Sequence, residues 1–455
     1  MSVVFESQRP DATATTLPLL DARDPQRIFA WRGGRAVSVA QFLAEVRALA
    51  AQLPHAQHAV NLCEDRYAFL LAFCAVALRG QTNLLPPSRA PQAVDEVRAA
   101  HPGCYALGEQ ALEHAPPGYL QFALPQVNAP ELCDVPLLPA GQVIAVGYTS
   151  GSTGAPKPNP KTLGGFHLSS ARNHAVVVAA AGSPCHVVAT VPPQHMYGME
   201  LSVLLPMLGE VAVHAGRPFF PADVAHALAE IPAPRVLVTT PVHLRALVAA
   251  APSLPPLAAI VSATAPLPAE LAREAEARFS ASVVEVFGST ETCVIAHRRT
   301  AHEDDWSLYP GVALHPQPDG TLVEAPHLPQ PVALADVVEL PAPGRFRLRG
   351  RNTDLLEIAG KRASLGDLTR RLLAIPGVED GVVFQLDEPD AAGVRRIAAL
   401  AVAPALGEAE ILAALRRAID PVFLPRPLKR VAALPRNDTG KLPRVALLAL
   451  LGREG

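Results

Sequence analysis

The sequence predicts an α/β protein with a large N-terminal domain of layered, mostly parallel sheets and a small α+β C-terminal domain. From residue 187 onward, short apolar runs alternate with helical runs, which is typical of a parallel α/β sheet. This rhythm breaks at the Pro-Ala-Pro-Gly run of residues 341–344, and a separate unit follows. The 455 residues are enough for two or three compact units at roughly 150 residues each.

The spacing of apolar residues predicts the individual elements. Prolines near the first turn support the helices expected after residues 220, 240 and 267. In the large domain we expect strands at 142–147, 187–191, 211–214, 236–239, 259–262 and 283–287, and helices at 39–53, 67–78, 221–231, 241–250 and 268–279. In the small domain we expect helices at 365–373 and 409–419, and strands at 381–386, 397–402 and 429–434.

Composition excludes several classes of function. With 39 basic and 42 acidic side chains, the chain has a net charge of −3 and no sign of a nucleic-acid surface. The six scattered cysteines indicate neither a zinc site nor a disulfide framework. The N-terminus does not resemble a signal peptide and no apolar run is long enough to insert into a membrane, so we predict a cytoplasmic protein with reduced thiols. The oligomeric state stays open.

Residues 148–157 have the chemistry of a phosphate-binding loop. Two glycines let backbone N–H groups approach phosphate oxygens, hydroxyls add donors and a lysine adds positive charge. Ser/Thr/Gly clusters are common in plain linkers, but a linker does not need a lysine at a fixed distance from two glycines. The spacing also differs from that of a P-loop. The candidate phosphate ligands are Thr149, Ser150, Gly151, Ser152, Thr153, Gly154 and Lys157.

Four motifs, in order along the chain, resemble those of the adenylate-forming superfamily. This superfamily includes acyl- and aryl-CoA synthetases, luciferases and the adenylation domains of peptide synthetases. The motifs are the loop of residues 148–157, Phe-Gly-Ser-Thr-Glu at 287–291, Gly-Arg-Asn-Thr-Asp at 350–354, and the lysine motif at 435–444. We therefore identify the chain as resembling an acid-activating enzyme.

The resemblance implies the following roles in a reaction with ATP and Mg²⁺. The loop wraps the β and γ phosphates, Glu291 and Thr149 hold Mg²⁺, Thr290 contacts the α-phosphate, and Phe287 and Gly288 belong to the nucleotide site. Mg²⁺ takes carboxylate and phosphate oxygens, which suits this assignment. Without the motif, Glu291 would be interpreted as a solvated loop residue.

The resemblance also assigns residues in the C-terminal part of the chain. Asp336 accepts hydrogen bonds from the ribose, Arg351 contacts ribose or phosphate, and Lys441 neutralises charge that grows in the transition state. The alternative for Arg351 is a surface ion pair, and for Lys441 a solvent-facing position.

A mobile small domain is a further expectation from the resemblance. It implies a large AMP-binding domain over residues 1–350, a hinge over 351–354 and a small lid domain over 355–455 that rotates between two half-reactions. Gly360 would flank the phosphopantetheine arm of the thiol substrate. The short interval between Glu291 and Asp336 implies a reduced β subdomain. Pro158, Asn159 and Pro160 depart from the family pattern, as does Glu357, and their effect stays open.

The segment of residues 192–198 resembles the family's acyl-pocket segment, in which His195 would lie beside the substrate; a packed structural histidine is the alternative. Amino-acid-activating members carry an aspartate shortly after this point, and no match is found here. Small side chains at 261–267 suit a planar ring or an acyl chain. We favour an aryl, hydroxybenzoate-like acid or an acyl acid as the small-molecule substrate.

The sequence thus predicts a ligase that forms an acyl- or aryl-adenylate and transfers the acyl group to a thiol. The thiol belongs to CoA or to the pantetheine of an acyl carrier protein, with a slight preference for the carrier. The alternatives are a nucleotide-binding regulatory module without turnover, against which Glu291 and Lys441 argue, and an adenylating enzyme with a non-thiol acceptor, as in luciferases.

Overall fold

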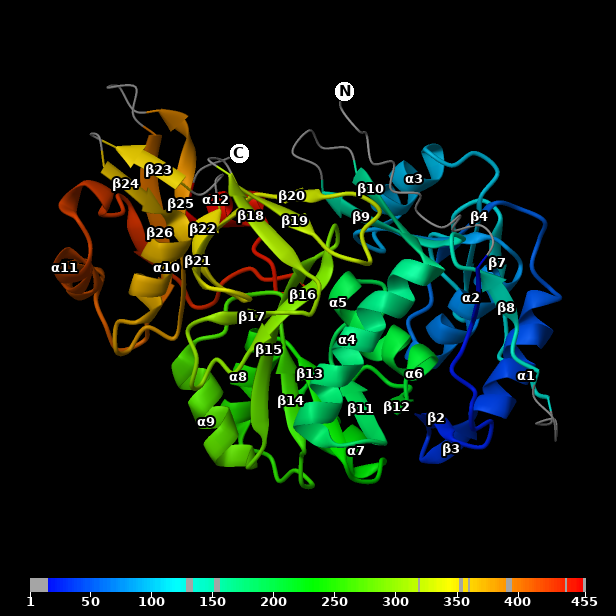
Figure 1. Ribbon diagram of the computed structural model, residues 1–455. Helices are drawn as coiled ribbons and strands as arrows, with labels where there is room; N and C mark the ends of the chain where they lie inside the picture. The colour runs from blue at the N-terminus through cyan, green and yellow to red at the C-terminus, as the bar shows by residue number, and fades with distance from the viewer. Residues whose placement is uncertain are drawn as a thin grey trace, which may run out of the picture. The chain divides into compact units, whose positions relative to one another are not determined.

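The computed structural model describes residues 15–127, 134–150, 156–317, 320–351, 355–358, 361–389, 395–437 and 440–452. The chain forms two compact units (Figure 1). Unit 1 comprises Met1–Glu303, Tyr309–Gly311 and Pro326–Pro329, and unit 2 comprises Asp304–Leu308, Val312–Ala325 and Gln330–Gly455. The hinge expected at 351–354 stays a prediction, because residues 352–354 lie outside the described ranges.

The first sheet of unit 1 has six strands and is mostly parallel. Its order is β10-β9-β5-β4-β6-β7, with only β10 antiparallel to its neighbour. Helix α2 is buried along almost its whole length, contacts three of these strands and packs against α1. The elements are β4 (His58–Asn61), β5 (Thr82–Leu85), β6 (Tyr105–Gly108), β7 (Tyr119–Gln121), β9 (Val143–Ser150), β10 (Pro156–Thr162), α1 (Val39–Ala50), α2 (Arg66–Leu78) and α3 (Pro91–Ala99), with the separate pair β1 (Thr16–Pro18) and β8 (Leu137–Pro139).

The second sheet of unit 1 has the order β16-β15-β14-β13-β11-β12-β2-β3. Strands β15 through β2 are parallel, and β16 and β3 pair antiparallel at the two ends of this series. The alternation expected from residue 187 is confirmed, and with it the α/β fold class. The strands are β2 (Ile28–Arg32), β3 (Arg35–Ser38), β11 (Cys185–Ala189), β12 (Val211–His214), β13 (Arg235–Thr239), β14 (Ala259–Ser262), β15 (Ser282–Ser289) and β16 (Cys293–Arg298).

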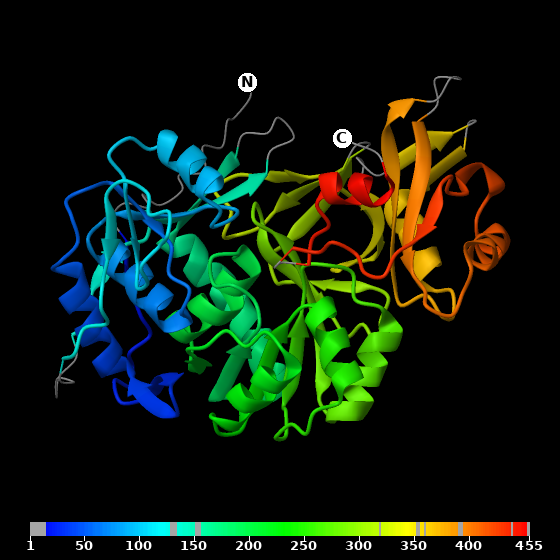
Figure 2. The same ribbon diagram turned by 180° about the vertical axis from the view of Figure 1, so that it is seen from behind.

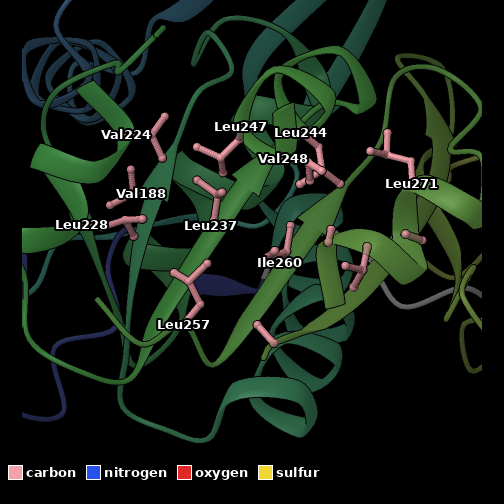
Figure 3. Packing of buried hydrophobic residues seen from close by; sticks show 14 of the residues in the cluster. Val188, Val224, Leu228, Leu237, Leu244, Leu247, Val248, Leu257, Ile260 and Leu271 are labelled. Atoms are coloured by element: carbon pink, nitrogen blue, oxygen red, sulfur yellow. The ribbon is translucent and has the colours of Figure 1, made fainter. Parts of the chain in front are cut away.

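Three helices that follow strands of this sheet form an apolar layer on it: α7 (Pro221–Ala229), α8 (Pro241–Ala250) and α9 (Ala269–Phe279). The other helices of this part of the chain are α4 (Leu163–Ala181), α5 (Met196–Met199), the π-helix η1 (Glu200–Leu204) and α6 (Leu205–Leu208). Side chains of α7, α8 and α9 pack against Val188, Leu237 and Ile260 of three neighbouring strands (Figure 3). These contacts hold the strand ends in fixed positions, which matters because ligands of α/β sheets bind at the carboxyl ends of the strands.

The strand expected to end at residue 147 is longer than predicted. Strand β9 continues through Thr149 to Ser150, and β10 begins at Pro156, so both ends of the predicted loop belong to a hairpin. Tyr148 and Thr149 favour extended backbone, which explains why strand pairing continues into a segment that the sequence predicts as loop. Residues 151–155 lie outside the described ranges.

Unit 2 combines antiparallel β structure with a small α+β module. Strand β17 (Trp306–Leu308) pairs with β22 (Arg345–Arg351), and β22 pairs with β21 (Asp336–Ala342). A three-stranded sheet contains β18 (Ala313–Gln317), β19 (Gly320–Glu324) and β20 (Val332–Leu334). The module contains β23 (Leu355–Ile358), β24 (Lys361–Ser364), α10 (Leu365–Leu373), β25 (Asp380–Pro389), β26 (Arg395–Val402), α11 (Glu408–Ala418), η3 (Pro421–Phe423), β27 (Leu428–Arg430) and α12 (Arg444–Leu450).

The β25–β26 ladder has two apolar faces. Val383, Ile397 and Ala399 pack with α10 and α11, whereas Phe384 and Leu400 pack with α12. Because side chains alternate along a strand, α12 lies on the face opposite α10 and α11 (Figure 2). The α+β class of the small domain is confirmed.

Two details of the predicted elements differ in the structure. The strand expected at 429–434 is only Leu428–Arg430, because its parallel pairing with β26 spans three residues before the chain turns away. The antiparallel strand β16 was not predicted. Within the described ranges, every helix is too short or too polar to span a bilayer.

We predict that Leu237→Ala lowers the free energy of unfolding by about 2–5 kcal/mol, because Leu237 is fully buried between β13 and the helix layer. Urea denaturation followed by circular dichroism measures the change. The control Leu168→Ala removes a side chain that is 44% exposed and should change stability by less than about 0.5 kcal/mol. Equal losses in the two variants would contradict this description of the core.

Candidate active site

Three segments that are distant in the sequence converge within unit 1. A Cβ added to Gly147 in β9 would lie 2.9 Å from Cγ2 of Thr290 and 3.3 Å from Cε of Met196. Thr290 follows β15, and Met196 is the first residue of α5. Three segments therefore meet at Gly147: the β9–β10 hairpin, the motif of residues 287–291 and the segment of residues 192–198.

The hairpin places two of the predicted phosphate ligands side by side. Thr149 and Lys157 are direct partners across the β9–β10 ladder. Thr149 is half-buried, and Lys157 is exposed. Ser150 lies opposite Pro156. The predicted ligands Gly151, Ser152, Thr153 and Gly154 lie outside the described residues, so their role stays a prediction.

A bulge at the end of β15 brings the chain back into β16. The register shifts between Phe287 and Gly288, and a Cβ on residue 288 would lie 2.1 Å from the carbonyl oxygen of Cys293. Any side chain there would push the two strands apart, so the motif requires glycine at this point. The hairpin can then close into the turn that carries Thr290 and Glu291.

Hydrogen bonds fix the backbone of this turn. Ser289 and Thr292 bond reciprocally, with each backbone N–H donating to the other hydroxyl at 3.1 and 3.2 Å. The Nζ of Lys161 donates to the carbonyl of Glu291 at 2.7 Å, and Nε2 of His327 donates to the carbonyl of Thr292 at 2.7 Å. The backbone is thus held by side chains, while the side chains of Thr290 and Glu291 stay partly accessible.

His327 works as a neutral donor. Burial lowers its pKa to about 4, from an ordinary value of 6.5. Because the Thr292 carbonyl can only accept, Nε2 must carry the proton. Its Nδ1 is buried and has no hydrogen-bond partner among the described residues. This histidine was not predicted as a site residue, because nothing in its local sequence indicates that it reaches the turn.

The predicted acyl segment is held against the ends of two strands. Tyr197 is buried, and its hydroxyl donates to the carbonyls of Thr239 and Val261 at 3.0 and 2.9 Å. His195 precedes α5, is half-buried and accepts a hydrogen bond from the N–H of Met199. The fully buried hydroxyl of Ser262, at the end of β14, has no partner among the described residues.

Unit 2 holds the remaining predicted residues that the structure describes. Asp336 and Arg351 are direct partners across the β21–β22 ladder, so the two expected nucleotide ligands lie together. Gly360 lies outside the described residues. Lys441 is exposed in a closed loop, in which its N–H donates to the side chain of Asn437 at 2.9 Å and its carbonyl accepts from the N–H of Asn437 at 2.8 Å.

Arg436 anchors the lysine loop. It donates to both carboxylate oxygens of Asp380 at 2.8 and 3.0 Å and to the carbonyl of Gly440 at 2.8 Å. Bidentate pairs of this kind have a defined geometry. Arg436 therefore ties the backbone at Gly440, the residue before Lys441, to Asp380.

Comparison with known proteins agrees with this arrangement. The model of the AMP-binding enzyme family matches residues 57–324, more than half of the chain. The chain belongs to this family. The resemblance to the adenylate-forming superfamily is thereby confirmed, and the matched range contains the first two of the four motifs.

Relatives and solved structures extend this family assignment. This AMP-binding enzyme is 33% identical over 304 residues to the 4-coumarate–CoA ligase of Rhodobacter capsulatus, covering 65% of this chain and 74% of that one. Its fold matches that of the o-succinylbenzoate–CoA synthetase of Bacillus subtilis, with a TM-score of 0.78, 16% identity, and 94% and 97% coverage. It also matches the amide bond synthetase of Marinactinospora thermotolerans, with a TM-score of 0.75, 17% identity, and 93% and 97% coverage.

The lowered pKa of His327 predicts a pH-dependent loss of stability. Because the unfolded chain protonates this histidine near pH 6.5 and the folded chain only near pH 4, its contribution falls as the pH falls through this window, by a total on the order of 3 kcal/mol. In His327→Gln, an amide replaces the Nε2 donor and cannot titrate. Its unfolding midpoint should therefore fall less than that of the wild type between about pH 7 and about pH 5.

Urea denaturation at the two pH values measures this difference. His114→Gln, which replaces an exposed histidine, is the control and should behave as the wild type does. An identical pH dependence in His327→Gln and in the wild type would show that His327 is not held neutral by its burial.

Proposed function

We propose that the protein activates a carboxylic acid with ATP and transfers the acyl group to a thiol. In the first step a carboxylate oxygen attacks the α-phosphorus of ATP, and pyrophosphate leaves. In the second step a thiol attacks the carbonyl of the acyl-adenylate, and AMP leaves. The convergence of Gly147, Thr290 and Met196 in a member of the AMP-binding family carries this proposal.

The first step brings two anions together and therefore needs cations and oriented donors. Lys157 stands opposite Thr149 at the start of the phosphate loop, where it would contact the β and γ phosphates. Thr290 would contact the α-phosphate. Mg²⁺ bound with ATP would neutralise phosphate charge, and the partly accessible Glu291 carboxylate and Thr149 hydroxyl are oxygen ligands of the type it takes.

Unit 2 would supply the ribose contacts and the second cation. The pairing of Asp336 with Arg351 supports one nucleotide subsite that contains both residues. Lys441 would stabilise the charge that grows between the carboxylate and the α-phosphate, an interaction that is stronger in the transition state than in the ground state. The hydrogen bonds between Asn437 and Lys441 would support such positioning.

For the acid, we propose an aryl carboxylate. The 4-coumarate–CoA ligase among the relatives acts, by its name, on an aryl acid, and the sequence independently favours an aryl or acyl acid. The end of β14 carries small residues and the unpartnered hydroxyl of Ser262, which would suit a flat ring with a polar substituent. His195 lies at the start of α5 and would face the same substrate.

For the acceptor, we propose CoA. The sequence alone favours a carrier protein slightly, but the relative that is 33% identical to this chain is named as a CoA ligase. A nitrogen acceptor is a second candidate, because the same fold occurs in an amide bond synthetase. The three acceptors share the adenylation step and differ only in the nucleophile.

Lys441→Ala should reduce acid-dependent pyrophosphate release about 100- to 1,000-fold, the loss typical of removing one oriented group that stabilises transition-state charge. ATP affinity, measured by calorimetry, should stay near that of the wild type. Lys429→Ala is a matched control, because Lys429 is also an exposed lysine of unit 2, and its Nζ donates to the Leu450 carbonyl. Unchanged pyrophosphate release in Lys441→Ala would refute the proposed role.

The acceptor can be identified by mass spectrometry of complete reactions. The protein is incubated with ATP, Mg²⁺ and a panel of aryl and aliphatic acids, together with CoA, a pantetheinylated carrier protein or an amine. We expect an aryl-CoA product. Transfer only to the carrier or only to the amine would replace CoA as the acceptor, and no pyrophosphate with any acid would favour a binding module without turnover.

A further inference from the structure

A buried lysine at the base of β10 is not explained by the roles assigned so far. Lys161 lies in the Pro158-Asn159-Pro160-Lys161 run, where the sequence departs from the family pattern. It is only 8% exposed, and its Nζ donates to the backbone carbonyl of Glu291 at 2.7 Å. The lysine thus reaches from the phosphate hairpin to the residue proposed to hold Mg²⁺.

A buried glutamate holds the other end of the same turn. Glu200 begins the π-helix η1 and is 1% exposed. One of its oxygens accepts from the N–H of Val294 at 2.9 Å, and the other accepts from Nδ2 of Asn173 at 3.0 Å and from the hydroxyl of Ser169. π-Helical turns of this kind occur frequently at functional sites.

These donors favour an ionised Glu200. The hydroxyl of Tyr309 donates to Oδ1 of Asn173 at 2.9 Å, which fixes the orientation of that amide and directs its NH₂ group at Glu200. Burial raises the pKa of Glu200, but the three hydrogen bonds and the positive charge of Lys161 oppose this shift. Hydrogen bonds to a buried carboxylate reduce the cost of its burial, and the charge of Lys161 adds to this effect.

One of the two residues between the Glu291 and Val294 contacts has a strained backbone. Cys293 has a φ of 58°, in a region that residues other than glycine rarely adopt, and it is buried. Burial and then the Glu200 charge raise the pKa of its thiol to about 12. Such a conformation persists only where the surrounding contacts determine it, and here Lys161 and Glu200 hold the backbone on either side of it.

We propose that Lys161 and Glu200 are positioning residues that set the Glu291 carboxylate in place for Mg²⁺·ATP. Lys161 holds the carbonyl of Glu291 and Glu200 holds the amide of Val294, so both contacts act on the same short stretch of backbone. Neither residue touches the reacting atoms. The inference rests on the proposed function, because it concerns how the adenylation site is assembled.

The test uses Lys161→Met, which removes the charge and the donor but keeps most of the volume, and Glu200→Gln, which keeps the shape. The affinity for ATP is measured by calorimetry with and without Mg²⁺, and pyrophosphate release is measured against Mg²⁺ concentration. We expect the affinity for ATP alone to be unchanged. The increase in ATP affinity caused by Mg²⁺ and the rate of pyrophosphate release should both fall about 10- to 100-fold, as is typical for partners of a metal ligand.

The double variant tests whether the two contacts act together. The fold-decrease of its Mg²⁺ response should be smaller than the product of the fold-decreases in the two single variants, because both residues act through one turn. Lys161→Arg, which keeps charge and donors, should restore part of the Mg²⁺ response. Glu45→Gln is the matched control, because Glu45 is also a buried carboxylate of unit 1 but bonds Tyr67 and Gln41 away from the turn.

The control should lose stability without changing its Mg²⁺ response. An unchanged Mg²⁺ response in both Lys161→Met and Glu200→Gln would overturn the inference, as would an equal change in Glu45→Gln. If the wild type binds Mg²⁺·ATP but releases no pyrophosphate with any acid, the proposed function fails, while the binding measurements still decide the role of the pair.

Discussion

The close approach between the end of β9 and the turn after β15 depends on the absence of a side chain at Gly147. A methyl group there would lie 2.9 Å from Cγ2 of Thr290, so the Thr290 side chain or the strand end would have to shift. The rest of the unit 1 site follows from this contact. It places the Thr149–Lys157 hairpin beside the Thr-Glu motif and α5 beside both.

The turn after β15 is stabilised by side chains from other segments as well as by its own Ser289–Thr292 hydrogen bonds. Lys161 comes from β10, His327 from a short segment of unit 1 distant in sequence, and Glu200 from η1. Side chains from three separate segments therefore hold the carbonyls of Glu291 and Thr292 and the amide of Val294. Preorganisation of this kind suits a site that must bind a strongly charged ligand without rearranging at the moment of reaction.

Much of the fold could be predicted from the sequence because the strands of unit 1 are short apolar runs bounded by turns and helices. The extension of β9 to Ser150 was missed, because hydroxyl residues beside glycines are also typical of loops. The resemblance implies Asp336 and Arg351 as nucleotide ligands, a role that stays a proposal, and strand register shows that the two residues are direct backbone partners. Lys161 and Glu200 could not be predicted, because the burial of a charged residue depends on partners distant in the chain. The sequence features that point to their burial are a lysine within a strand and a glutamate within an apolar helix.

The central claim is that this site joins a carboxylate to AMP. The most direct measurement is mass spectrometry of the protein incubated with Mg²⁺·ATP and an aryl acid such as 4-coumarate, with no thiol or amine present. We expect an aryl-adenylate retained by the protein, with one pyrophosphate released for each adenylate formed. ATP binding without adenylate formation, for every acid in a broad panel, would contradict this claim.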